Sequence, residues 1–137
     1  MTRPKILLFF EYATLNGGEL SLLAILEALG HTEFEFVAAA PTSGMLVGRL
    51  EQCGIQTLSL ALRGTQGHKR SLEQINSHLV ELVTQVSPDL VHSNSLSMGR
   101  MVGRIASQLQ KAGFWLVDAE TAEEERKKFA DTLSEED

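Results

Sequence analysis

The chain of 137 residues has the length of a single domain, and its content of 43% apolar and 22% charged residues is that of an ordinary globular protein. No apolar run approaches the roughly 20 residues that are needed to span a bilayer. The single cysteine, Cys53, excludes an internal disulfide and favours a cytoplasmic location.

The net charge of −6 is unevenly distributed along the chain. Residues 1–117 carry nine acidic and nine basic side chains, whereas residues 118–137 carry nine acidic and three basic ones. Because no basic excess exists to replace the counterions of a phosphate backbone, we expect no nucleic-acid partner. The same division predicts the layout: residues 1–117 form the domain, and residues 118–137 form an acidic C-terminal helix that completes or caps it.

Apolar runs with the length of buried strands alternate along the chain with stretches of helical period. The expected strands cover residues 5–10, 34–40, 55–62, 89–94 and 113–117. The expected helices cover residues 18–29, 43–53 and 96–109, with a further helix between Ser71, where Gln74 completes a capping box, and Pro88. This alternation predicts an α/β fold, a three-layer Rossmann-like domain with about five parallel strands and helices on both faces.

The segment "NGGE", residues 16–19, lies where the first expected strand leads into the first expected helix. In a parallel sheet, ligands bind at the carboxyl ends of the strands, near the strand at which the order reverses. Two glycines at a helix start leave its amide N–H groups uncovered, and the helix dipole favours an anion there. Asn16 could cap the helix or bond a sugar hydroxyl. Two interpretations stay open for Gly17 and Gly18, a tight turn alone or the close approach of a phosphate or sugar.

Two common phosphate-binding fingerprints are missing, since the sequence contains neither G-x-G-x-x-G nor Gly-Lys-Ser/Thr. His31, His68 and His78 lie on different elements without the spacing of metal ligands, so we assign no metal and no cofactor. Cys53 has no His or Asp pattern around it and is interpreted as a packing residue rather than a nucleophile.

Short polar side chains follow the fourth expected strand, in the order His92, Ser93, Asn94 and Ser95. They could contact a sugar or a phosphate, but capping of the next helix is the stronger interpretation of Ser95. His92 fits either a ligand contact or a satisfied position at the end of a buried strand. The loop that contains Ser43 and Gly44 lies at the same edge of the predicted sheet and is a second candidate for ligand contact.

Three basic residues, Arg100, Arg104 and Lys111, fall on one polar side of a helix. A solvated helix face explains them well. An acidic acceptor or a membrane headgroup would also fit, so a peripheral membrane contact stays among the alternatives.

The order of three segments resembles the N-terminal, acceptor-side domain of family 4 glycosyltransferases, which have the GT-B fold. The segments are "ILLFFEYATLNGGELSLLAILEAL", "FVAAAPTSGMLVGRLEQCGIQTLSL" and "VSPDLVHSNSLSMGRMVGRIAS", which lie within residues 5–107. Their most specific features are the glycine pair with Glu19, Pro-x-x-Gly-x-Leu after the second strand, and Pro-Asp-Leu-Val-His-x-Asn.

This resemblance implies glycosyl transfer from a nucleotide sugar. Residues 16–19 would form the turn that faces the donor diphosphate. Residues 92–95, together with Ser43 and Gly44, would line the side that holds a sugar or a lipid-linked acceptor. The family's nucleotide-sugar-binding C-terminal domain does not occur in this sequence, so we expect no activity without such a domain or a partner chain.

The resemblance fades after Ser107. Where the family has a His-Asp pair after the fifth strand, this sequence reads "FWLVDAE", with Asp118 but no histidine. His92 and Asp118 are therefore only candidates for a catalytic general base. Two other functions stay open, a non-catalytic binding or interaction module and a small nucleotide-binding domain of the doubly wound type.

Overall fold

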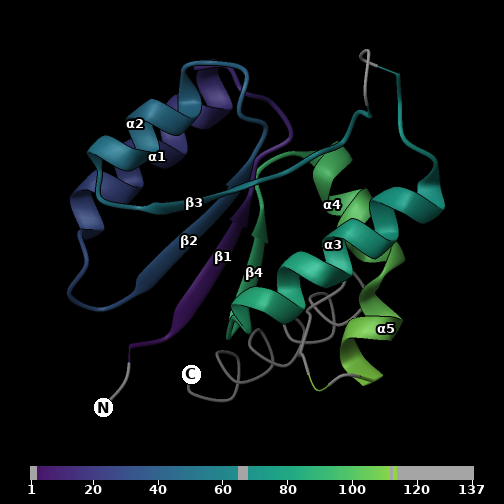
Figure 1. Ribbon diagram of the computed structural model, residues 1–137. Helices are drawn as coiled ribbons and strands as arrows, with labels where there is room; N and C mark the ends of the chain where they lie inside the picture. The colour runs from purple at the N-terminus through teal and green to yellow at the C-terminus, as the bar shows by residue number, and fades with distance from the viewer. Residues whose placement is uncertain (1–2, 65–67, 112, 114–137) are drawn as a thin grey trace, which may run out of the picture.

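The computed structural model describes residues 3–64, 68–111 and 113 (Figure 1). In this part of the chain the strands are β1 (Lys5–Phe9), β2 (Glu35–Ala40), β3 (Gln56–Ser59) and β4 (Leu90–Ser93). They form one parallel sheet with the order β3-β2-β1-β4. The helices are α1 (Gly17–Leu29), α2 (Leu46–Gln52), α3 (Leu72–Val86), α4 (Leu96–Arg104) and α5 (Ala106–Lys111). The predicted α/β, Rossmann-like architecture is confirmed.

Successive side chains of the central strand β1 enter two separate cores. Leu7 and Phe9 pack with residues of α3, α4 and α5, whereas Leu8 and Phe10 pack with residues of α1 and α2. All four side chains are buried, as expected for a strand that is covered on both faces. Figure 1 shows the same arrangement, with α1 and α2 on one side of the sheet and α3, α4 and α5 on the other.

The strand order reverses at β1, and this reversal decides where a ligand can reach the sheet. From β1 the chain adds β2 and then β3 on one side, whereas β4 pairs with the opposite edge of β1. The amide of Asn94, just after β4, donates to the carbonyl oxygen of Phe9 at 2.9 Å. The loops that follow β1 and β4 therefore begin next to each other, at the switch point where doubly wound sheets bind ligands.

Strand β3 is shorter than the strand predicted at 55–62, because its neighbour β2 ends before Pro41. The last backbone hydrogen bond between the two segments runs from the Leu60 amide to the Ala40 carbonyl at 3.0 Å. Beyond that point the chain leaves the sheet and leads into the loop that precedes α3.

The single helix predicted at 96–109 is wrong, because α4 ends at Arg104 and α5 begins at Ala106. The amide of Ile105 bonds to the carbonyl of Val102 at 3.1 Å, which closes α4 with a tighter turn. Ile105 and Leu109 are both fully buried in the core that also holds Val102. The break in the helix at Ile105 leaves the apolar periodicity intact, because the buried face of α4 continues into α5. Periodicity alone therefore does not reveal the break.

The fifth predicted strand, at 113–117, lies outside the described residues except for Gly113, and the acidic helix predicted within 118–137 lies entirely outside them. The described ranges therefore hold four of the about five predicted strands. No helix in residues 3–64, 68–111 and 113 has the length and hydropathy that crossing a membrane requires.

Candidate functional site

The turn from Asn16 to Glu19 opens α1 beside the carboxyl end of β1. Asn16 has the extended backbone of an N-cap residue, but its side chain makes no capping hydrogen bond. Its Nδ2 instead donates to Oγ1 of Thr14 at 3.2 Å, and that hydroxyl donates to Oε1 of Glu19 at 3.1 Å. Glu19 is only 7% exposed. The first amide N–H groups of α1, which lack acceptors within the helix, are thus not capped by the Asn16 side chain.

The backbone does not require glycine at either position of the pair. Neither Gly17 nor Gly18 has a positive φ, so each conformation suits any L-residue. A Cβ atom on Gly17 would meet no atom within 4 Å, and one on Gly18 would meet only Nδ2 of Asn94, at 4.0 Å. The tight-turn interpretation therefore has no support in the geometry, and the space beside Gly17 is open to a ligand.

Two of the four polar residues at the end of β4 contact the segment that follows β1. Asn94 Nδ2 donates to the carbonyl oxygen of Gly18 at 3.3 Å. Ser95 Oγ accepts from the Met98 amide at 3.0 Å, which confirms its predicted role as the cap of α4. The same hydroxyl donates to Oε2 of Glu11 at 2.8 Å.

The other two polar residues lie in strand β4 itself. Ser93 pairs in register with Phe9 and is half-buried. His92 pairs with Leu8 and is exposed, so it is not enclosed with the turn of α1. Asp118, the other candidate base, lies outside the described residues.

Gly44 has a packing role in the loop before α2. A Cβ atom at this position would lie 2.3 Å from the carbonyl oxygen of Ala13, a distance that real Cβ contacts essentially never show. The same oxygen accepts the Leu46 amide at 3.0 Å. Gly44 thus lets the loop after β2 lie against the loop after β1, while its neighbour Ser43 is exposed at the cavity described next.

A cavity of about 790 Å³ lies at the carboxyl ends of β1, β2 and β3. Its walls come from the loops that follow these strands and from one side of α3 and α4. Part of the wall is apolar, formed by Leu60, Leu62, Leu72, Ile75 and Met101. A volume of this size falls in the range of about 300–1,000 Å³ that is typical of small-molecule sites.

The charged lining of this cavity is mostly basic. Among the described residues it consists of Arg63, Lys69, Arg70 and Arg104, with Glu11 as the one carboxylate. The segment "RGTQGHKR", residues 63–70, holds three of these residues, and it lies between an expected strand and an expected helix without a motif that marks a site. The signal that could have revealed them is the density of three basic residues within eight positions of that segment.

A second cavity, of about 340 Å³, lies beside it on α3, and His78 forms part of its lining. His78 Nε2 accepts the amide of Ala61 at 3.0 Å and fixes the chain just after β3. Burial lowers the pKa of His78, and the nearby Arg70 guanidinium lowers it further; Glu81 and a backbone hydrogen bond to Ser59 oppose the shift. Nε2 of His78 can accept this hydrogen bond only while the imidazole is neutral.

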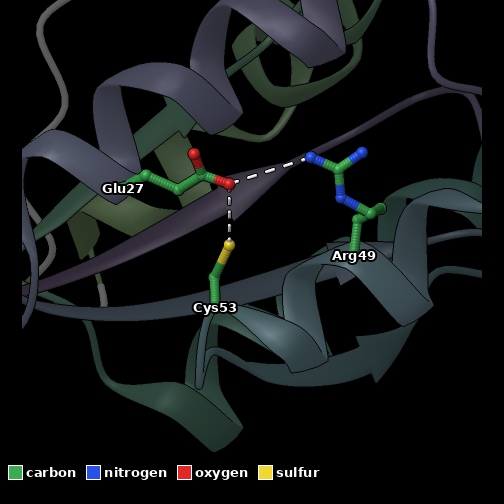
Figure 2. Close-up of polar contacts among 3 residues, drawn as sticks. All are labelled: Glu27, Arg49 and Cys53. Atoms are coloured by element: carbon green, nitrogen blue, oxygen red, sulfur yellow. Dashed lines mark hydrogen bonds and ion pairs between the residues drawn. The ribbon is translucent and has the colours of Figure 1, made fainter.

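Cys53 lies at the C-terminal end of α2, far from the carboxyl edge of the sheet. Figure 2 shows it together with Glu27 and Arg49. Its Sγ donates to Oε1 of Glu27 at 3.7 Å, and the same oxygen lies 3.8 Å from Nη2 of Arg49. Burial raises the pKa of the Cys53 thiol, the charge of Glu27 and its hydrogen bond raise it further, and Arg49 lowers it. A thiol held in its protonated form agrees with a packing role.

No group of three His, Cys, Asp or Glu side chains within the described ranges has an arrangement that could hold a metal ion.

Solved structures share this fold. HepE from Anabaena, crystallised in complex with UDP and glucose, is 21% identical to this chain, with a TM-score of 0.60, over 83% of this chain and 29% of HepE. The chain has a GT-B-like fold. MurG from Acinetobacter baumannii is 18% identical, also with a TM-score of 0.60, over 82% of this chain and 34% of MurG. The chain thus spans about a third of the length of these two proteins.

No protein-family model matches the chain, and no curated protein matches it either. The likeness to HepE and MurG is a likeness of fold, at an identity of 21% or less.

Proposed function

We propose that the chain is the acceptor-side domain of a GT-B sugar transferase of family 4, and that it takes part in glycosyl transfer from a nucleotide sugar. The observation that carries this proposal is the start of α1, which is uncapped and open at the switch point of a GT-B-like sheet. HepE, which has a similar fold, was crystallised with UDP and glucose. Because the chain matches 29% of HepE, a second domain or chain would supply the contacts to the nucleoside, whereas this chain would supply those to the diphosphate.

In this function the amides of Gly17 and Gly18 would face the diphosphate of the donor. Negative charge grows on the leaving diphosphate as the bond to the sugar breaks, and fixed N–H dipoles at a helix start stabilise such charge. Asn94 donates to the Gly18 carbonyl, and Glu19 holds the Thr14 hydroxyl. These contacts keep the turn in place before the ligand arrives.

The acceptor would lie in the cavity beside this turn, with Ser43 on its wall. The hydrogen bond from Ser95 to Glu11 connects the loop after β4 with the lining of the cavity. Asn94, the neighbour of Ser95, donates to the Gly18 carbonyl on the donor side. The adjacent residues Asn94 and Ser95 would therefore link the donor side to the acceptor side by hydrogen bonds. His92 and Asp118 are candidates for the general base that deprotonates the acceptor hydroxyl.

A titration of two leucine variants with UDP-glucose tests the donor side. At both Gly17 and Gly103 an added Cβ meets nothing within 4 Å, and leucine is a good helix former, so Gly17→Leu and Gly103→Leu should both fold. Gly103 lies on α4, in the opposite helical layer. We expect millimolar binding of UDP-glucose by the wild type and by Gly103→Leu, and loss of binding by Gly17→Leu, because the leucine side chain fills the space beside the turn.

Uridine, which lacks the diphosphate, should not bind. Equal binding by Gly17→Leu and the wild type would contradict the proposal. Absence of binding by a folded wild-type chain would favour a non-catalytic interaction module instead.

A further inference from the structure

The described residues cover strand β4 on only one of its two faces. Val91 packs against the core that α3, α4 and α5 cover. Leu90 points to the other face, because it pairs in register with Ile6, which packs against the core beneath α1 and α2. Among residues 3–64, 68–111 and 113, that second core holds no residue of β4, and Leu90 is 44% exposed. Parallel sheets are normally covered on both faces, so this face of β4 lacks a cover in the described part of the chain.

The flank of α1 that faces β4 is apolar and exposed. Gly18 marks this flank, because a Cβ atom on Gly18 would lie 4.0 Å from Nδ2 of Asn94, just after β4. The next residues along the same flank follow at intervals of four, three and four, and they are Leu22, Ile25 and Leu29. Leu22 is half-buried, whereas Ile25 is 53% and Leu29 is 43% exposed.

The opposite flank of α1 faces α2. Glu27 contacts Arg49 and Cys53 there (Figure 2). Leu20 lies seven positions before Glu27, which is about two helical turns, so it belongs to that flank. The uncovered apolar side chains on the β4 side are Leu22, Ile25, Leu29 and Leu90, and we call them the α1–β4 surface.

Residues 118–137, which lie outside the described residues, have the sequence pattern of a helix that could cover this surface. Their apolar side chains fall within roughly one third of a helix circumference and are Ala119, Ala122, Phe129, Ala130 and Leu133. Arg126 lies in the same stripe, and its methylene groups can rest on an apolar surface while its charge stays in water. A single helix of this length is only marginally stable in water, so it needs a surface on which to bury its apolar side.

We propose that residues 118–137 form an amphipathic helix whose apolar side covers the α1–β4 surface. Helix α5 ends at Lys111, and residues 112–117 can span about 20 Å, which allows the chain to pass around β4. The other face of β4 is already filled by α3, α4 and α5, so the α1–β4 surface is the side that is left for a further helix. A segment of the same chain also has a high effective concentration at this surface, which favours it over a separate partner. This docking is independent of the proposed function.

A spin label on residues 118–137 tests the docking in the full chain. Cys53→Ser removes the native thiol, and Lys128→Cys carries a nitroxide on the polar side of the expected helix. In an amide NMR spectrum, we expect the nitroxide to broaden the signals of Ile25 and Leu90 more strongly than that of Glu73, which is exposed on α3 across the sheet. Broadening that is strongest at Glu73, or that is absent from Ile25 and Leu90, would overturn the proposal.

A mixed sample shows whether the cover comes from the same chain. Chains that carry the nitroxide but no isotope label are mixed with isotope-labelled chains that carry no nitroxide. We expect no broadening of Ile25 and Leu90 in this mixture, because each surface is covered by its own chain. Broadening in the mixture as strong as that within one chain would show that the segment covers a second copy, and would overturn the proposal.

Serine variants of α1 locate the contact. Ile25→Ser removes an apolar side chain from the α1–β4 surface. Leu20→Ser is the matched control, because Leu20 is 44% exposed on the flank of α1 that faces α2. We expect Ile25→Ser to lower the midpoint of urea unfolding more than Leu20→Ser and to weaken the broadening of the Leu90 signal, since only Ile25 would be buried by the docked segment. Equal effects of the two variants would overturn the proposal.

Discussion

Replacement of Gly44 by alanine tests how closely the loops after β1 and β2 pack. The new Cβ atom would lie 2.3 Å from the Ala13 carbonyl oxygen and 2.8 Å from the Ala13 carbonyl carbon, whereas ordinary contact begins near 3.4 Å. One loop must therefore move by about 1 Å, which costs about 1–3 kcal/mol in a packed site. The Ala13 oxygen also accepts the Leu46 amide, and loss of that bond costs about 1 kcal/mol more. We expect Gly44→Ala to lower the free energy of unfolding by about 2–4 kcal/mol.

Two other glycines supply the controls. An added Cβ meets no atom within 4 Å at Gly17 or at Gly48, and both residues are helical. Gly17→Ala and Gly48→Ala should therefore leave the free energy of unfolding unchanged or raise it by up to about 1 kcal/mol, because alanine favours the helix more than glycine does.

Urea unfolding followed by far-ultraviolet circular dichroism measures all three variants. With a slope of about 1–3 kcal/mol per molar urea, the midpoint of Gly44→Ala should fall by about 1 M or more. A midpoint of Gly44→Ala that equals the wild-type value would refute the packing argument. A fall in Gly17→Ala as large as that in Gly44→Ala would refute the conclusion that the turn of α1 has free space.

Four further side chains have measurable roles. Glu27→Gln should lower the pKa of Cys53 and speed its alkylation at mildly alkaline pH, whereas Arg49→Gln should slow it, because the carboxylate raises and the guanidinium lowers that pKa; the opposite order of rates would contradict the contacts in Figure 2. The pKa of His78 is lowered in the folded chain, so the unfolded chain binds the proton first as the pH falls through the ordinary value of 6.5. Below that pH the wild type should lose stability, down to the lower pKa of the folded chain, and His78→Gln should lose less; equal losses in pH-dependent urea unfolding would exclude this cause. Ser71→Ala should lower the free energy of unfolding by about 1 kcal/mol in the same assay, because it removes a capping box whose two hydrogen bonds are both present, and an unchanged value would show that the cap does not stabilise α3.

Features that depend on local sequence could be predicted. The apolar run that contains Leu7 and Phe9 gave β1, and the spacing of Ser71 and Gln74 gave the start of α3. Ser95 likewise caps α4, as predicted. These predictions succeed because strand burial and helix capping involve residues that are close together in the chain.

Features that depend on distant segments could not be predicted in the same way. Gly17 and Gly44 look alike in the sequence, yet only the fold brings the Ala13 oxygen against Gly44 and leaves Gly17 free. The basic cavity combines the loop after β3 with Arg104 of α4, for which the sequence alone left a solvated helix face, an acidic acceptor and a membrane headgroup as alternatives. The break at Ile105 depends on a core that α4 and α5 share.

The most direct test of the proposed donor turn is an amide NMR titration of the chain with UDP-glucose. If the start of α1 faces the donor diphosphate, the amide signals of Gly17 and Gly18 should shift, together with that of Asn94, which is hydrogen-bonded to Gly18. UDP should reproduce these shifts and uridine should not. A well-dispersed spectrum in which these signals stay unchanged at millimolar UDP-glucose would contradict the account.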